Sequence, residues 1–294
     1  MTARLPSYAV VTPARNEAEN LMRLGRSLAA QTMPPDAWIV VENGSTDASL
    51  DVASALAHEY PWIRVAQIQP TVDVRRGGPI VRAFNEGVAR LERPPDIIVK
   101  LDADVSMEPD YFERVLGAFA ADQTLGIASG SAYEQRDGDW RQLFLTRTAV
   151  WGAARAYRLE CLRDVSPLEE RMGWDGVDEL KANLRGWSTR TLADVPFRHH
   201  RREGERDGAR RKAWQAQGEV AHFMGYRISY LLLRALHRAR HEPAALAMVI
   251  GFVRATLRRE ERCLDPAVRS YLRRQQRLRE LPLRAREALG YRAP

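Results

Sequence analysis

The first 120 residues alternate four times between a short apolar run and a segment with helical periodicity. The apolar runs are residues 8–11, 38–41, 62–68 and 96–101. Leu21, Leu24 and Leu28 recur at helical spacing after the first run, and Pro109 suits the first turn of a helix after the fourth. Short connections between alternating strands and helices require right-handed crossovers. The sequence therefore predicts an α/β fold with a mainly parallel sheet flanked by helices.

The loops after three of these strands are expected to share one edge of the sheet. They begin at Thr12, Glu42 and Asp102. Ligands of open parallel sheets bind at the carboxyl ends of the strands, so this edge is where chemistry is expected.

Asp102 and Asp104 directly follow the fourth strand. In extended backbone, residues i and i+2 point the same way, so both carboxylates can face one point. Paired carboxylates bind Mg²⁺ or Mn²⁺, and these ions also bridge diphosphate oxygens. An Asp-x-Asp pair can also be an acidic turn in solvent, but its position at the end of this strand favours a metal site.

Composition and cysteine usage favour a soluble protein of a reducing compartment. Hydrophobic residues make up 45% of the chain and charged residues 28%. Cys161 and Cys263 form no CxxC pair, and no apolar signal segment follows Met1. The longest apolar stretch, residues 244–253, is far shorter than the ~20 residues of a membrane span. The expected location is the cytoplasm, including the inner face of the cell membrane.

The formal net charge of +7 hides an asymmetry between the two ends of the chain. From Arg198 onward, 23 Lys and Arg stand against 10 Asp and Glu, and the preceding part carries a net charge of −6. A charged connector (residues 201–212) leads into predicted helices at 220–239 and 243–262 and a final Arg-rich segment. Their apolar residues beside arginines are typical of helices that contact a membrane surface, and would also suit a homodimer interface or the closure of an acceptor site.

Several short motifs resemble, in order and spacing, those of family 2 glycosyltransferases. They cover residues 8–200: TPARNE at 12–17, VENGSTD at 41–47, AFNEG at 83–87, LDAD at 101–104, GWDGVDE at 173–179 and Gly186-Trp187. Each motif is weak by itself, and the ordered set carries the resemblance. The chain departs from the family pattern at Glu42-Asn43, where two aspartates are usual, and at Trp174-Asp175, where Glu-Asp is usual.

The resemblance implies a GT-A fold in residues 1–200, with a nucleotide-sugar half (1–105) and an acceptor half (106–200). Residues 201–294 would form a basic helical extension. The implied activity is an inverting, metal-dependent transfer of sugar from a UDP-, GDP- or TDP-sugar to a glycan or lipid-linked acceptor, as in polysaccharide or cell-envelope synthesis. The implied nucleotide-binding residues are Pro13, Ala14, Asn16, Glu17, Asn43, Arg82 and Asp102.

Further basic residues near the predicted rim could hold diphosphate oxygens. They are Arg75, Arg76 and Lys100, although for each of these, as for Arg82, a solvated surface position is the favoured interpretation. Asn43 stands where the family reads the base with a carboxylate, and its amide offers both a donor and an acceptor. Alternatively, Asn43 is simply a turn residue before Gly44.

Two aspartates compete for the role of catalytic base. The resemblance favours Asp175, which lies eleven residues before Gly186 as in the family, over Asp178, which could instead cap a helix over residues 179–185. The resemblance also makes His199 a third metal ligand beside Asp102 and Asp104, with His200 as the alternative and Mn²⁺ favoured over Mg²⁺. Trp151 could line the acceptor site or pack in the core.

Two other classes of protein share part of this pattern. A sugar-phosphate nucleotidyltransferase also uses two aspartates and a metal, but its first strand is normally followed by a Gly-rich basic loop instead of Pro13 to Glu17. A nucleic-acid-binding protein would fit the sequence pI of about 9.7. The basic residues lack interleaved exposed aromatics, so binding to nucleic acid is not expected.

Overall fold

The computed structural model describes residues 4–70, 77–136, 138–143, 149–201, 210–240, 242–277 and 280. Its contacts divide the chain into two compact units, Met1–Arg201 and Arg202–Pro294. Two large clusters of buried apolar side chains lie in the first unit and a smaller one lies in the second, so each unit has a core of its own.

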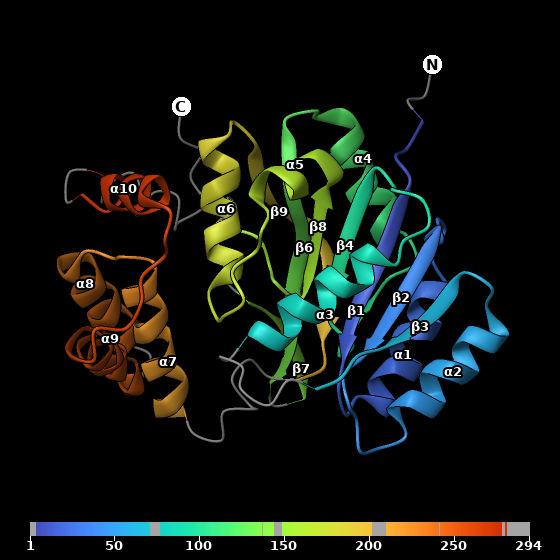
Figure 1. Cartoon of the computed structure of the whole chain (residues 1–294), viewed down its shortest axis with the longest axis horizontal. Helices are drawn as coiled ribbons and strands as arrows, with labels where there is room; N and C mark the ends of the chain where they lie inside the picture. Colours follow the sequence, from blue (N-terminus) through green and yellow to red (C-terminus); the bar gives the residue numbers. More distant parts are fainter. Residues whose placement is uncertain are drawn as a thin grey trace. The chain divides into compact units, whose positions relative to one another are not determined.

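A nine-stranded sheet forms the centre of the first unit (Figure 1). Its first half runs in the order β3-β2-β1-β4, with all neighbours parallel. The strands are β1 (Tyr8–Ala14), β2 (Ala37–Glu42), β3 (Ile63–Gln67) and β4 (Ile97–Leu101). These are the four strands predicted from the apolar runs, and their parallel pairing is confirmed.

The second half of the sheet is mixed, which the pattern of apolar runs does not reveal. Beyond β4 the order is β8-β6-β9-β5, and β7 pairs with β6. The strands are β5 (Val105–Met107), β6 (Leu125–Arg136), β7 (Asp139–Gln142), β8 (Ala154–Arg158) and β9 (Ser188–His199). The sequence predicts an edge strand over residues 189–197; the strand is present as β9, but it is not at the edge of the sheet. It lies beside β6, and its last three residues also pair with β5.

Strands β1, β2 and β4 are buried on both faces because helices cover each side of the sheet, whereas β3 at the edge exposes Arg64 and Gln67. Val10 and Val99 share one core with the helices of one face, and Val11 and Ile98 share the other core with the opposite helices, in line with the alternation of side chains along a strand. The first set is α1 (Ala18–Ala29), α2 (Ser49–Glu59) and α4 (Tyr111–Ala121). The second set is α3 (Gly78–Ala89), which lies in front of the sheet in Figure 1, α5 (Leu159–Val165) and α6 (Trp174–Leu184).

The interpretation of Asp178 as a helix cap is wrong. It requires a helix that begins at residue 179, whereas α6 begins five residues earlier, at Trp174. Gly173 precedes the helix in a left-handed conformation with φ of 90°, which glycine adopts without strain. Asp175 therefore lies in the first turn, and Asp178 lies inside the helix, where it caps nothing.

The second unit is helical. Its elements are α7 (Arg210–Phe223), α8 (Ile228–Ala239), a 3₁₀ turn (Pro243–Leu246), α9 (Ala247–Leu257) and α10 (Pro266–Gln275). The single helix predicted over residues 220–239 is wrong, because Gly225 has φ of 77° and ends it. Helix α9 also ends before residue 262. Within the described residues, no helix combines the length and apolarity that crossing a membrane requires.

Helices α7 and α9 cross at two glycines. A Cβ atom on Gly218 would lie 1.9 Å from the carbonyl oxygen of Met248, and one on Gly251 would lie 2.0 Å from the carbonyl oxygen of Gln215. Both neighbours are backbone atoms, so the two helices could accept a side chain here only by moving apart.

We expect Gly218→Ala to destabilise the second unit, by about 1–3 kcal/mol in free energy of unfolding, because of this overpacking. Gly117 of α4 is the matched control, since a Cβ atom there meets nothing within 4 Å. Alanine in a helix is favoured over glycine, so Gly117→Ala should be neutral or stabilising by about 0.5–1 kcal/mol. Urea unfolding followed by circular dichroism would measure both changes. Equal stability of the two variants would contradict the close crossing.

Candidate active site

The loops that follow β1 and β2 are joined by hydrogen bonds at the carboxyl edge of the sheet. The backbone N–H of Asn16 donates to Ser45 Oγ at 3.0 Å, and the N–H of Thr46 donates to Asn16 Oδ1 at 2.8 Å. The N–H of Glu17 donates to Ser49 Oγ at 2.7 Å. Asn16 has φ of 56°, which asparagine tolerates better than most residues. Pro13 and Ala14 end β1 in register with β2, so the two predicted nucleotide-binding loops form one rigid wall.

Asn43 lies on this wall with one polar atom unused. Its backbone N–H donates to the carbonyl of Ala14 at 2.9 Å, and the residue is 8% exposed. Its side-chain Oδ1 is buried and has no hydrogen-bond partner among the described residues. A buried acceptor without a partner is costly, so this oxygen is suited to receive a hydrogen bond from a ligand.

A buried lysine underlies the first aspartate of the Asp102-Ala103-Asp104 motif. Lys100 Nζ contacts Asp102 Oδ1 and donates to the carbonyl of Gly152 at 2.9 Å. Lys100 is 2% exposed, so its interpretation as a solvated surface residue is wrong. Asp175 also lies beside Gly152, since a Cβ atom at residue 152 would be 3.1 Å from Asp175 Oδ2. Lys100 and Gly152 thus bring Asp102 and Asp175 to the same place.

The second aspartate of the motif contacts two residues from the end of β9. His199 Nε2 is 3.4 Å from Asp104 Oδ1, and Arg201 Nη1 is 3.4 Å from Asp104 Oδ2. Arg201 also makes a bidentate contact with the Glu17 carboxylate, at 2.9 and 2.7 Å. The other ring nitrogen of His199 is 3.4 Å from Glu134 Oε1. Arg201 therefore connects the loop after β1 to the loop after β4.

His199 and His200 differ in direction. His200 Nε2 is 2.7 Å from Ser106 Oγ, and its ring packs edge-on against Trp140, whereas His199 faces Asp104. Burial lowers the pKa of His199, but its contacts with Asp104 and Glu134 outweigh burial and raise the pKa to about 10. Burial and nearby Arg23 lower the pKa of His200 to about 4. Burial raises the pKa of Asp102, and Lys100 opposes this effect.

The carboxylates and the imidazole have the chemistry of a divalent-metal site, but they are not arranged as a finished one. Among the described residues, no group of three or more His, Cys, Asp or Glu side chains already converges to hold an ion. Asp104 and His199 are close enough to share an ion, while Asp102 is engaged by Lys100. Metal binding would therefore require Asp102 to turn or to offer its second oxygen.

Asp178 is the centre of a buried network beneath Asp175. Its carboxylate accepts from Arg155 Nη2 at 2.6 Å and Nε at 3.1 Å and contacts the hydroxyl of Tyr157. Arg155 also donates to the backbone carbonyl of Asp175 at 2.8 Å and to Glu179 at 3.0 Å. Asp178 is 1% exposed. Its oxygens are thus committed to the protein, whereas Asp175 is partly exposed.

Burial also raises the pKa of both acidic partners of Arg155. The pKa of Asp178 is raised to about 6 and that of Glu179 to about 8, and in both cases Arg155 opposes the effect of burial. Glu179 additionally accepts from the backbone N–H of Val150 at 2.8 Å, which fastens the segment before Gly152 to α6.

The family model for glycosyl transferase family 2 matches residues 9–232. The chain belongs to glycosyl transferase family 2. Polyprenol monophosphomannose synthase of Mycolicibacterium smegmatis is 31% identical over 216 residues, which are 66% of this chain and 77% of that protein. Undecaprenyl-phosphate mannosyltransferase of Micrococcus luteus is 30% identical over 184 residues, 55% of this chain and 71% of that protein.

Solved glycosyltransferases share the fold. The mannosyltransferase PcManGT from Pyrobaculum calidifontis, in complex with GDP-Man and Mn²⁺, superimposes with a TM-score of 0.58 at 15% identity and covers 97% of this chain and 85% of its own. GalNAc-T7 with UDP, GalNAc and Mn²⁺ gives a TM-score of 0.59 at 15% identity, over 82% of this chain and 52% of its own. The predicted GT-A fold is confirmed.

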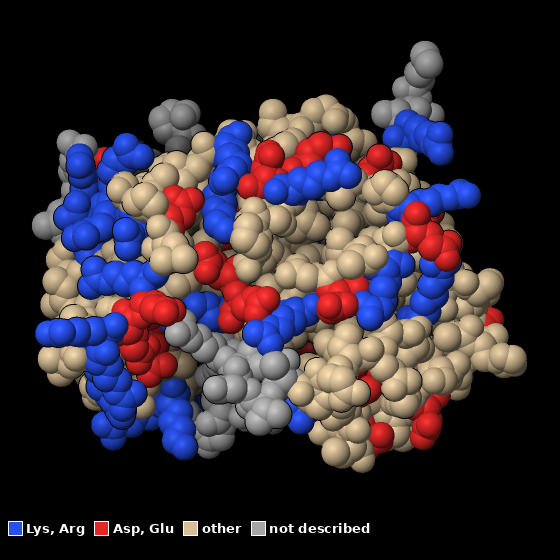
Figure 2. Space-filling view, viewed as in Figure 1, with Lys and Arg blue, Asp and Glu red and all other residues tan. Residues whose placement is uncertain are grey.

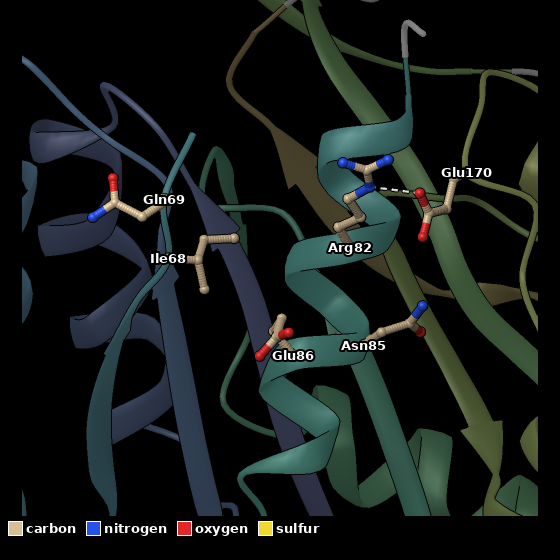
Figure 3. Close-up of a pocket in the computed structure, with 6 residues that line it drawn as sticks. All are labelled: Ile68, Gln69, Arg82, Asn85, Glu86 and Glu170. Carbon is tan, nitrogen blue, oxygen red and sulfur yellow. Dashed lines mark hydrogen bonds and ion pairs between the residues drawn. The ribbon is translucent and has the colours of Figure 1, made fainter. Parts of the chain in front are cut away.

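Arg82 of this family 2 glycosyltransferase contacts Glu170, not the Asp102-Ala103-Asp104 motif. Its guanidinium pairs with Glu170, and both line a pocket of about 370 Å³ (Figure 3). The rest of that lining comes from the end of β3 and the exposed face of α3: Ile68, Gln69, Asn85 and Glu86. Arg75 and Arg76 lie outside the described residues. Trp151 packs against the core, and its buried indole N–H has no partner among the described residues.

Three residues that organise the site escaped the sequence analysis. Arg201 stood next to the two histidines but was assigned to a charged connector. Arg155 is a fully buried arginine between two alanines of β8, and Glu134 is a buried glutamate near the polar end of β6. A charged residue between small apolar ones in a strand is a signal that would have identified Arg155, because charges are buried only when paired. No comparable signal marks Glu134.

We expect Arg155→Met to destabilise the first unit strongly, by about 3–5 kcal/mol in free energy of unfolding, because Asp178 and Glu179 would remain buried without their cation. Arg64→Met is the matched control: Arg64 pairs with Glu92 at 2.8 Å, but both side chains are exposed. That change should cost no more than about 1 kcal/mol. Denaturant unfolding at neutral pH compares them, and similar costs would show that the buried network contributes little.

Proposed function

We propose that this chain is an inverting, metal-dependent glycosyltransferase that moves a sugar from a nucleoside diphosphate to a hydroxyl group of a glycan or lipid-linked acceptor. Polysaccharide or cell-envelope synthesis is the setting that the relatives suggest. Family membership favours glycosyl transfer over the nucleotidyltransferase and nucleic-acid-binding alternatives.

One observation carries the proposal: Lys100 and Gly152 bring the aspartate that follows β4 and the aspartate of the first turn of α6 together. Metal-dependent glycosyl transfer needs carboxylates that hold a metal ion beside the departing diphosphate. It also needs a second carboxylate that removes the proton from the acceptor hydroxyl. Asp102 and Asp104 suit the first task, and Asp175 suits the second.

For the donor nucleotide, we propose that the loops after β1 and β2 hold the base and ribose. The unpartnered Oδ1 of Asn43 would accept a hydrogen bond from the base. Pro13, Ala14 and Asn16 would form the surface beneath it. The Glu17 carboxylate is already held by Arg201, so its suggested role is to keep the wall and Arg201 in place rather than to bind ribose alone. Arg82 would reach the diphosphate only by leaving Glu170.

For the metal, Asp102, Asp104 and His199 are the proposed ligands, and the donor's diphosphate would complete the coordination. A bound Mn²⁺ or Mg²⁺ supplies positive charge that stabilises the departing diphosphate. Mn²⁺ is the better match for a set that includes an imidazole. The Mn²⁺ complexes of the neighbouring folds support this choice.

The proposed reaction is a single displacement at the anomeric carbon. Asp175 accepts the proton of the acceptor hydroxyl as its oxygen forms the new bond to carbon. The bond from that carbon to the diphosphate oxygen breaks, and the nucleoside diphosphate leaves with the electron pair. Asp178 is a poor alternative base because Arg155 and Tyr157 occupy its oxygens.

A second acceptor class is favoured by the relatives. Two of them are named for mannosyl transfer to a polyprenol phosphate. A phosphate acceptor is already an anion and would need no base, so it would leave Asp175 without a proton to remove. GDP-mannose is the first donor to test with either acceptor.

We expect Asp104→Asn to abolish the metal-dependent part of nucleotide binding. Wild-type protein should show a rise in melting temperature with one of GDP, UDP, TDP or CDP that grows when Mn²⁺ is added, because an ion held by Asp104 would offset the charge of the bound diphosphate. Asp51, exposed on α2, is the control, and Asp51→Asn should retain the full rise. A Mn²⁺-dependent rise that survives in Asp104→Asn would contradict the proposed ligand set.

We expect Asp175→Asn to keep the nucleotide-dependent rise but to lower kcat by about 10²–10⁴-fold with a hydroxyl acceptor. Release of nucleoside diphosphate with glycan and polyprenyl-phosphate acceptors would measure it. Near wild-type turnover with a polyprenyl phosphate would favour the second acceptor class. Loss of turnover in a folded Asp178→Asn variant, with Asp175→Asn active, would reverse the assignment of the base.

A further inference from the structure

The exposed large apolar side chains of the described residues are all found in the second unit, between Ile228 and Leu264. Most of them lie on α8 and on the segment formed by the 3₁₀ turn and α9. They are Ile228, Leu232, Leu233 and Leu236, and then Leu246, Ile250, Val253 and Leu257. Scattered exposed apolar residues are normal, but this concentration in one helical unit indicates a binding surface.

Both sets follow helical periodicity. Ile228, Leu232 and Leu236 recur every four residues on α8, so they form one stripe. Leu246, Ile250, Val253 and Leu257 recur at intervals of four, three and four, which also forms one stripe. Leu236 is 60% exposed and Leu257 is 77% exposed. These stripes differ from the residues that pack inside the unit, such as Leu231 and Met248.

The charges next to these stripes are mostly positive. Residues 226–262 contain eight arginines against three acidic residues, Glu242, Glu260 and Glu261, and neither α8 nor α9 contains an acidic residue. Lys and Arg side chains gather over the helices of this unit in Figure 2. Arg238 and Arg258 are exposed near the ends of the two helices. Long arginine side chains can lay their apolar stems along a surface and keep the charge in water.

We propose that the two apolar stripes of α8 and α9, with their flanking arginines, bind the surface of an anionic lipid bilayer. Helices of this kind lie in the interface with apolar residues among the acyl chains and cations among the headgroups. An anionic membrane supplies the opposite charge along the whole surface. A second copy of this chain fits less well, because a symmetric contact places the same arginine-rich patch on both sides.

This proposal does not rest on the proposed reaction, because binding to vesicles needs neither donor nor acceptor. Full-length protein would be mixed with vesicles of phosphatidylcholine, with or without phosphatidylglycerol, and separated by flotation. We expect flotation with the anionic vesicles, little with the neutral ones, and weaker binding at high salt because exposed charges are screened.

Two variants test the stripes. Leu232→Ser with Leu236→Ser, and separately Ile250→Ser with Leu257→Ser, should each lower the bound fraction about tenfold or more by removing apolar area. Leu264→Ser is the matched control, since Leu264 is 87% exposed but outside both helices, and it should bind as wild type does. Unchanged melting temperature and nucleotide response would show that each variant remains folded.

The outcomes are distinct. Flotation of wild type that the two double variants lose and Leu264→Ser retains would support the membrane surface. Wild-type protein that fails to float with anionic vesicles would overturn it. A wild-type dimer that the double variants convert to monomer, without any vesicle binding, would assign the same surface to a second copy of the chain.

Discussion

The parallel pairing of β1 with β2 on one side and β4 on the other is the constraint on which the candidate active site depends. It sets Ala14 opposite Glu42 and Val11 opposite Lys100, so the loops that follow all three strands leave the sheet at one edge. Each strand is apolar on both faces because helices cover both sides. Burial of these strands therefore forms the core of the unit and at the same time determines where the polar loops lie.

Gathering acidic residues at one edge would be unfavourable without cations to offset their repulsion. Three basic side chains do this at different depths. Lys100 lies under Asp102, Arg201 joins Glu17 to Asp104, and Arg155 holds Asp178. Arg201 and Arg155 each contact an acidic group far away in the sequence, and Lys100 contacts Asp102, two residues later. Each contact therefore also restrains the backbone that carries the acidic group. The acidic side chains of this site are thus divided between those held by protein cations and Asp175, which is partly exposed.

The sequence predicted the parallel half of the fold well because its strands are short apolar runs, of which β1, β2 and β4 are buried on both faces. It did not predict β5, since three residues carry no period, nor the position of β9 inside the sheet, which depends on β5. Asp102 and Asp104 could be proposed as site residues from the sequence because they directly follow a strand. Arg155 and Arg201 were missed because their importance comes from partners more than twenty residues away in the sequence. Periodicity reports which face a residue occupies and says nothing about the charge it will meet there.

The same reasoning explains why the C-terminal helices were harder to delimit. Their apolar residues are not all buried: α8 buries only Leu231 and Ala235, while larger apolar residues remain exposed on it. Because the apolar residues lie on more than one face, the sequence pattern predicts one long helix over residues 220–239. In the structure Gly225 interrupts this segment, so α7 and α8 are separate helices. The unit is nevertheless held by a core of its own, centred on the close crossing of α7 and α9. Exposed apolar area concentrated on a stably packed helix points to a partner outside the unit, and its arginines favour an anionic one.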